Sequence, residues 1–299
     1  MNTIPLLVIC GPTASGKTSL SIKLAQMLDG EIISADSVQI YRGMDIGSAK
    51  PTKQEMSQIT HHMIDIVDPW VDYSVSDFVS DSIIRINDII ARGRLPIICG
   101  GTGFYLHSLL YDLDFSGIAP NQELRNELSK MDTDDLYQRL LSLDPATTLH
   151  RNDRKRVIRS IEVLSQGGQI NRFRQEHPRF HFHQFCLSWE RATLYKRINS
   201  RCEEMILDGF IDEVNSLLQN PLINSSLQSM QSIGYSQICR YLNGEISLDT
   251  SIEDMKQTTR RFAKRQLTWF RHESNCNVIS CESFNSIDEI CVNIKKAIE

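Results

Sequence analysis

Short apolar runs alternate with helical patterns in the first third of the chain. The runs Leu6–Cys10, Glu31–Ser34 and Leu95–Cys99 are continuous, as in strands that a parallel sheet buries on both faces. Lys17–Leu28 and Val75–Arg92 carry apolar residues at helical spacing. This alternation of strand and helix predicts an α/β fold, with a parallel sheet flanked by helices.

The pattern changes after about Ser116, where strands give way to helices. Gly117–Pro120 interrupt the chain, and short amphipathic helices are expected at Asn121–Lys130, Asp134–Ser142 and Asp153–Gln166. These segments predict an all-helical insertion over residues 119–183, which divides the α/β core into 1–118 and 184–299.

Long helices dominate the last third of the chain. Gln184–Ser188 has the character of a strand that returns to the sheet, and Asn277–Ser280 is a second candidate strand. Helices are expected at Arg191–Asp208, Leu248–His272 and Ser286–Ile298.

A glycine-rich motif follows the first predicted strand. Residues 11–18 fit G-x-x-x-x-G-K-[ST] in full, between a strand and the start of a helix. The glycines let successive backbone N–H groups point at phosphate oxygens, and the helix N-terminus adds its positive end. Lys17 supplies a mobile cation, and Thr18 offers a hydroxyl to Mg²⁺. The motif predicts a P-loop NTPase-like core whose phosphate-binding residues are Gly11, Pro12, Thr13, Ala14, Ser15, Gly16, Lys17 and Thr18.

Asp36 follows the second predicted strand and is expected at the carboxyl edge of the sheet, beside the phosphate loop. There it could hold Mg²⁺ indirectly or accept a proton from a nucleophile. It could also only cap a helix, a contribution of about 1 kcal/mol. A second glycine-rich turn, Gly100–Gly103, ends another strand and either approaches a ligand or forms a tight turn.

Composition limits the class of protein. The 299 residues are 41% hydrophobic and 23% charged, as in ordinary globular enzymes. No apolar run approaches the roughly 20 residues of a membrane span, and the first residues lack the basic region of a signal peptide. The eight cysteines form no Cys-x-x-Cys pair, so no zinc site is expected, and a reducing cytoplasm fits them.

Basic residues are clustered although the net charge is −5. One cluster lies at 151–159 and another along the predicted helix at 248–272, where no acid occurs between Lys256 and His272. Each cluster is either a solvated helix face or a site of phosphate contacts with RNA.

Longer blocks of sequence resemble the bacterial tRNA dimethylallyltransferase family, also called IPP transferases. The resemblance covers nearly the whole chain, and the block Asp36–Pro51 is its most specific part. The matching blocks are Gly11–Thr18, Asp36–Pro51, His61–Asp65, Asp68–Pro69 with Tyr73–Ser74, Gly100–Tyr105, Asn152–Asp153 with Arg156 and Arg159, Ile233–Tyr235 and Arg265–Arg271.

The resemblance implies a reaction. The dimethylallyl group of dimethylallyl diphosphate moves to N6 of adenosine 37, in tRNAs that read codons starting with U, and diphosphate leaves with the help of Mg²⁺. The resemblance places the phosphate loop and Arg201 on the diphosphate. It makes Asp36, Thr102 and Lys17 catalytic, with Asp36 as the base. It places the anticodon stem-loop against Asp36, Ser37, Val38, Gln39, Thr102, Arg125, Lys155, Arg156, Val157, Ile158 and Arg159.

Other functions use the same loop. A small-molecule or nucleoside kinase would bind ATP there and use Asp36 as base for a hydroxyl. An adenylate isopentenyltransferase would prenylate free nucleotides, and a nucleotide-dependent switch would only bind RNA. The basic clusters favour a macromolecular acceptor, and we expect a cytoplasmic monomer.

Overall fold

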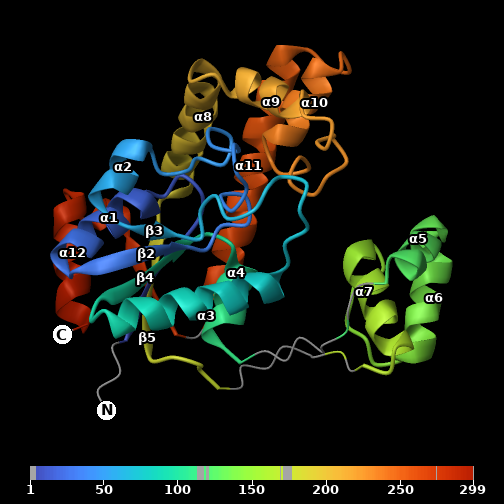
Figure 1. Cartoon of the computed structure of the whole chain (residues 1–299), viewed down its shortest axis with the longest axis horizontal. Coiled ribbons are helices and arrows are strands. Elements are labelled where there is room, and N and C mark those ends of the chain that lie inside the picture. The colour runs from blue at the N-terminus through green and yellow to red at the C-terminus, as the bar shows by residue number, and fades with distance from the viewer. Residues whose placement is uncertain are drawn as a thin grey trace. The chain divides into compact units, whose positions relative to one another are not determined.

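The structure is a computed structural model that describes residues 5–112, 118, 121–168, 170, 177–273 and 275–298 (Figure 1). It contains two compact units: unit 1 comprises Met1–Leu110 with Arg179–Glu299, and unit 2 comprises Tyr111–Pro178. The expected insertion was 119–183, and residue 119 lies outside the described residues. The segment after Pro178 belongs to unit 1 because the backbone N–H of Arg179 donates to the Leu110 carbonyl, at 2.8 Å.

Unit 1 is built on a parallel sheet, as predicted. The described residues form six strands in the order β3-β2-β4-β1-β5-β6. The central strand β1 is fully buried because β4 and β5 flank it and helices cover both faces. The strands are β1 (Leu6–Cys10), β2 (Gly30–Ser34), β3 (His61–His62), β4 (Leu95–Gly100), β5 (Phe182–Ser188) and β6 (Cys276–Ser280).

Helices cover the two faces of this sheet. Leu7 and Ile9 point into an apolar cluster with residues of α1 (Lys17–Met27) and α12 (Ile287–Ile298). On the other side lie α3 (Val75–Ala91) and α4 (Gly103–Leu110) (Figure 1). The other helices of unit 1 are α2 (Lys53–Gln58), α8 (Arg191–Leu207), α9 (Phe210–Leu218), α10 (Tyr235–Leu242) and α11 (Leu248–Arg271), with a 3₁₀ turn at Cys281–Ser283.

Unit 2 is helical and has its own core. Its helices are α5 (Gln122–Lys130), α6 (Thr133–Leu143) and α7 (Arg154–Ser165). Leu128, Leu136 and Val157 are among the residues of this core and are fully buried. The Asp132 carboxylate accepts hydrogen bonds from the backbone N–H groups of Asp134 and Asp135, and this cap starts α6 one residue before the predicted Asp134.

Five elements of unit 1 were not predicted: α2, β3, α4, α9 and α10. They are only two to nine residues long, and β3 has only two residues. Helices α9 and α10 nevertheless carry an amphipathic pattern that could have predicted them. Within the described ranges, no helix combines the length and the apolar character that a membrane span requires.

Candidate active site

A cavity of about 410 Å³ lies at the carboxyl ends of the central strands. It brings together segments that are far apart in the sequence: the phosphate loop, the turns after β2 and β4, and helices α8 and α11. Most of the predicted site residues of unit 1 line it, namely Thr13, Ala14, Lys17, Thr18, Asp36, Ser37, Val38, Gln39, Thr102 and Arg201. Ser15 and Gly16 line a second cavity, of about 460 Å³, that shares Ala14, Lys17, Thr18 and Arg201 with the first.

The phosphate loop has the backbone of an anion cradle. Gly11 and Gly16 have φ angles of 141° and 95°, in the region that favours glycine. A Cβ atom at Gly11 would lie 2.7 Å from the Leu187 carbonyl oxygen, so the loop is pressed against β5. Helix α1 begins at Lys17 directly after Gly16, and its first N–H groups therefore face the loop.

Side chains from α8 and from the residue after β5 hold the carbonyl groups of this loop. Arg197 Nε donates to the Ala14 carbonyl at 2.8 Å, and the Trp189 indole N–H donates to the Ser15 carbonyl at 2.9 Å. The Arg197 guanidinium also stacks over the Trp189 ring, with 4.7 Å between its carbon and the ring centroid. These contacts fix the carbonyl groups of the loop, while two of its N–H groups are bonded within the protein: Thr13 N–H donates to Gln266 at 2.9 Å and Ser15 N–H donates to the Pro12 carbonyl at 3.3 Å. The sequence analysis missed Arg197 in this role, although its spacing of four residues from Arg201 places both on one face of α8.

Two half-buried cations and one carboxylate set the electrostatics of the cavity. Burial lowers the pKa of the Lys17 ammonium, and the Asp36 charge partly opposes this shift. Burial also lowers the pKa of Arg201, and Asp36 again opposes it. The Lys17 Nζ atom donates to the Pro12 carbonyl at 2.7 Å. Two poorly solvated cations beside a phosphate loop favour a bound polyanion.

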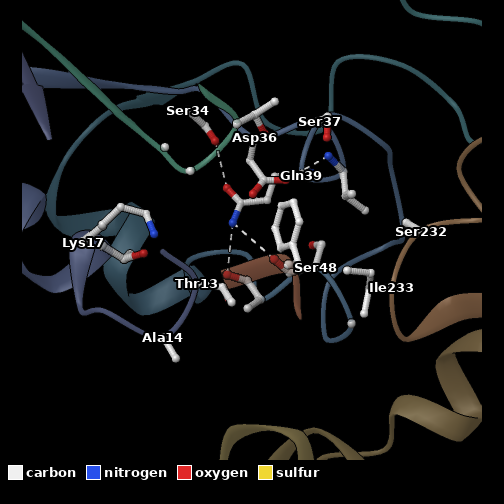
Figure 2. A pocket seen from close by; sticks show the side chains of 18 of the residues that line it. Thr13, Ala14, Lys17, Ser34, Asp36, Ser37, Gln39, Ser48, Ser232 and Ile233 are labelled. Carbon is white, nitrogen blue, oxygen red and sulfur yellow. Dashed lines mark hydrogen bonds between the residues drawn. The ribbon is translucent and has the colours of Figure 1, made fainter. Parts of the chain in front are cut away.

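Asp36 forms the turn after β2. Its Oδ1 atom accepts hydrogen bonds from the backbone N–H groups of Val38, at 2.8 Å, and Gln39, at 3.3 Å. Asp36 therefore caps a turn and not a helix, as one of the three alternatives had it, because no helix begins here and the next one, α2, starts at Lys53. The carboxylate lines the cavity that Lys17 also lines, as Figure 2 shows. Because only Oδ1 holds the turn, Oδ2 is left for a role in the reaction.

Gln39 is fully engaged in holding the turn. Its Oε1 atom accepts a hydrogen bond from the Ser34 hydroxyl at 2.8 Å (Figure 2). Its Nε2 atom donates to the carbonyls of Ser48 and Ala49, at 3.3 and 3.1 Å. Gln39 therefore joins the end of β2 to the second half of the Asp36–Pro51 segment.

Glu213, which was not predicted, and Tyr235, which lies in one of the matching blocks, hold the Asp45–Gly47 part of that segment. Glu213 on α9 accepts hydrogen bonds from the backbone N–H groups of Asp45, Ile46 and Gly47, at 2.9, 2.7 and 3.2 Å. The Tyr235 hydroxyl donates to the same carboxylate at 2.6 Å. These contacts fix the Asp36–Pro51 segment, whose Asp36–Gln39 and Gly47–Ala49 parts line the cavity.

The second glycine-rich turn lies against both the loop and β2. A Cβ atom at Gly100 would lie 2.2 Å from the Ala35 carbonyl oxygen, so only glycine fits. Gln266 on α11 donates from Nε2 to the Gly101 carbonyl and accepts from the Thr13 N–H, both at 2.9 Å. One amide thus ties this turn to the phosphate loop and leaves Thr102 on the wall of the cavity.

Two predicted RNA contacts in unit 2 are tied to a buried acid. Arg125 donates from Nε and Nη2 to the Glu162 carboxylate, at 2.9 Å each, and Arg159 also pairs with it. Glu162 is fully buried. Burial raises its pKa, but hydrogen bonds from the two arginines outweigh burial, and the net shift is downward. Both guanidiniums remain partly exposed, at 36% and 38% of the side chain.

The other four predicted RNA contacts of unit 2 lie along α7. Lys155 and Arg156 are exposed, and Arg156 pairs with Asp153 at 2.8 Å. Val157 is fully buried and Ile158 is half-buried against the same apolar core. The helical period turns the Val157 side chain into the core, so an RNA contact of this residue stays a prediction for its backbone alone.

Comparisons with known proteins agree with this geometry. The family model described as IPP transferase matches residues 39–273, and the model described as isopentenyl transferase matches residues 4–68. The tRNA dimethylallyltransferase of Pelotomaculum thermopropionicum is 43% identical over 99% of this chain and 96% of its own length. The enzyme of the same name from Exiguobacterium sp. is 47% identical over 91% of this chain and 89% of its own.

Solved structures show the same fold. A tRNA delta(2)-isopentenylpyrophosphate transferase from Staphylococcus epidermidis matches with a TM-score of 0.75 and 38% identity, over 98% of both chains. A eukaryotic dimethylallyltransferase acting on tRNA matches with a TM-score of 0.83 and 28% identity, over 98% of this chain and 79% of the other. By the family model and by its identity to these relatives over nearly its full length, this chain belongs to the IPP transferase family, the tRNA dimethylallyltransferases.

Proposed function

We propose that this chain transfers the dimethylallyl group of dimethylallyl diphosphate to N6 of adenosine 37 in tRNAs that read codons starting with U. The observation that carries the proposal is the cavity of about 410 Å³, which joins a phosphate loop, two cations and a carboxylate. Family membership supports tRNA as the acceptor, because the relatives are tRNA dimethylallyltransferases. A kinase would use the same loop, but neither the family nor the relatives favour it.

The phosphate loop binds the diphosphate of the donor. The N–H groups at the start of α1 face the diphosphate, and Lys17 and Arg201 supply positive charge where negative charge grows as the C–O bond breaks. Apolar side chains of the same cavity accept the isoprenoid chain. These side chains are Ile198, Met205, Ile233 and Phe262.

Asp36 and Thr102 serve the adenine. As the N6–carbon bond forms and the carbon–oxygen bond breaks, diphosphate leaves with the bonding electron pair, and the N6 proton passes to the Asp36 carboxylate. Thr102 lines the same cavity and contacts the reacting base. Ser37, Val38 and Gln39 contact the neighbouring nucleotides through the turn that Asp36 caps.

Mg²⁺ fits the loop as a partner of the donor. The Thr18 side chain lines both cavities next to Lys17, and a hydroxyl oxygen beside phosphates suits this hard cation. When bound, Mg²⁺ neutralises charge on the diphosphate. Thr18 would hold it, and Lys17 would contact the phosphates.

Unit 2 contributes contacts to the tRNA backbone. Lys155 and Arg156 are exposed, and Arg125 and Arg159 present partly exposed guanidiniums around Glu162. Phosphate contacts of this kind position RNA without reading its sequence. The target adenosine leaves its stack to reach Asp36, as in other enzymes that modify bases.

Transfer of a labelled dimethylallyl group to an anticodon stem-loop tests the proposal. We expect label in a stem-loop with adenosine 37 and none in the same stem-loop with guanosine 37. A parallel reaction with ATP and without dimethylallyl diphosphate tests whether the protein acts as a kinase. Consumption of ATP, with dimethylallyl diphosphate left intact, would overturn the proposal.

A further inference from the structure

Three cysteines from three strands meet directly beneath the phosphate loop. Cys10 is the last residue of β1 and precedes Gly11, Cys186 is its partner in register on β5, and Cys276 begins β6. Their sulfur atoms all lie within 4.8 Å of one another, and those of Cys10 and Cys276 are 3.8 Å apart. Cys10 and Cys186 are buried, and Cys276 is half-buried. The sequence could not show this cluster, because the three residues are far apart along the chain.

The backbone of the sheet does not suit a disulfide between these cysteines. Strands β1 and β6 lie on opposite sides of β5, so a whole strand separates Cys10 from Cys276 and holds their Cα atoms farther apart than the roughly 7 Å that a disulfide allows. Cys10 and Cys186 are neighbours in register on parallel strands, which keeps their Cβ atoms near the strand spacing of about 4.8 Å. A disulfide needs about 3.5–4.5 Å.

The same spacing suits a shared metal ion. Thiolate–metal bonds of about 2.3 Å that meet at a tetrahedral angle hold two sulfurs about 3.8 Å apart, and at a trigonal angle about 4.0 Å. The sulfurs of Cys10 and Cys276 already have this separation, at 3.8 Å. From this match we infer that Cys10, Cys186 and Cys276 form a binding site for a soft, thiophilic metal ion, of which Cu(I) is the best fit.

The ligand set favours Cu(I) over zinc. Soft thiolate ligands select Cu(I) and zinc, but structural zinc almost always has four ligands. Among the described residues, the cluster contains three cysteines and no histidine or carboxylate as a fourth ligand. The buried Gln184 amide points its Nε2 atom at the Cys10 sulfur, at 3.5 Å, and stabilises charge on it. This site is separate from the proposed magnesium partner Thr18, which offers a hard oxygen.

Anaerobic titration with Cu(I), in competition with a cuprous chelator, tests the site. We expect wild-type protein to retain a single Cu(I) ion per chain. Cys186→Ser is expected to lower the affinity by more than the roughly 10–100-fold typical of losing an outer-shell partner. Cys239→Ser is the matched control, because Cys239 is equally buried, on α10, outside the cluster. It is expected to bind Cu(I) as wild type does.

Measurements on wild-type protein keep the inference testable if Cys186→Ser does not fold. X-ray absorption of the Cu(I)-loaded protein is expected to show three sulfur neighbours at about 2.3 Å. Bound Cu(I) is expected to protect Cys276 from alkylation but not Cys99, which is also half-buried but lies outside the cluster. Equal binding by Cys186→Ser, a nitrogen or oxygen shell around the metal, or a disulfide in place of bound Cu(I) would each overturn the inference.

Discussion

The backbone N–H of Thr13 donates to the side chain of Gln266, 253 residues later in the chain, at 2.9 Å. The other end of this amide donates to the Gly101 carbonyl, also at 2.9 Å. Gln266 is buried, and both ends of its amide bond to backbone groups of the site. It therefore acts as a positioning residue, which sets the distance between the proposed diphosphate site and the turn that carries Thr102.

Replacing this amide separates its positioning role from ordinary stability. Gln266→Leu keeps the volume but leaves the Thr13 N–H and the Gly101 carbonyl without their partner. We expect a loss of about 1–3 kcal/mol in unfolding free energy for each buried group left unsatisfied. We also expect KM for dimethylallyl diphosphate to rise, because the loop is no longer held in place. Gln266→Glu can still accept from Thr13, and KM is expected to recover in part. Equal KM values for wild type and Gln266→Leu would contradict the positioning role.

Asp36→Asn tests the base without removing the turn. An asparagine Oδ1 atom can still accept from the N–H groups of Val38 and Gln39, so the fold is expected to survive. The amide cannot take the N6 proton, and kcat is expected to fall by about 10²–10⁴-fold. Binding of tRNA, measured by fluorescence anisotropy, is expected to change little. Wild-type turnover in the Asp36→Asn protein would disprove the assignment.

The ionisation of Glu31 on β2 makes the unfolding free energy of unit 1 depend on pH. Its side chain is 1% exposed. Burial raises its pKa, but hydrogen bonds from Arg92 and His62 outweigh burial and lower the pKa from 4.5 to about 2. A carboxyl whose pKa is lowered by folding stabilises the fold above its unfolded pKa. This contribution, about 3 kcal/mol, is lost as pH falls from about 4.5 toward 2.

Chemical denaturation at a series of pH values measures this contribution. Glu31→Gln is expected to lower the unfolding free energy near neutral pH and to remove most of its fall between about pH 4.5 and 2. Glu282→Gln changes an exposed carboxylate and serves as the control, with little expected effect. An unchanged pH profile in Glu31→Gln would show that Glu31 does not carry the dependence.

The basic residues of α7 divide into two kinds. Lys155 is exposed, and Lys155→Ala is expected to weaken tRNA binding and reduce the slope of log affinity against log salt by about 1, with little change in stability. Arg159 pairs with the buried Glu162, so Arg159→Ala is expected to destabilise unit 2 by about 1–3 kcal/mol. Filter binding between about 50 and 200 mM salt and thermal denaturation measure the two effects. A stable Arg159→Ala protein would refute the structural role.

The spacing of apolar residues along the chain predicted the buried strands and the long helices. The run Leu6–Cys10 has no polar position because sheet neighbours and helices surround it, and Val75–Ala91 shows one apolar face. The phosphate loop at 11–18 was predicted because the spacing of its Gly, Lys and Thr residues is specific to this loop conformation. Inside α7, the positions of Val157 and Ile161 follow the helical period and could have shown that Val157 faces the core.

Other features of the site depend on contacts between distant residues. Glu213 meets Asp45–Gly47, and Arg197 meets Ala14, over separations of 166 residues or more. No local pattern connects such pairs, because a carboxylate on a helix has the same spacing whether it faces solvent or a backbone turn. The two-residue strand β3 was missed for a related reason: its pairing to β2 defines it, and its own sequence does not.

The carbonyl groups of Pro12, Ala14 and Ser15 already have partners in Lys17, Arg197 and Trp189. The cradle is therefore complete before any anion arrives, and its ordering belongs to folding rather than to binding. A cradle of this kind holds inorganic pyrophosphate by the same atoms that held the donor. We expect departure of the spent leaving group, rather than bond making at the adenine, to limit steady-state turnover, and a burst of prenylated RNA in the first cycle would reveal it.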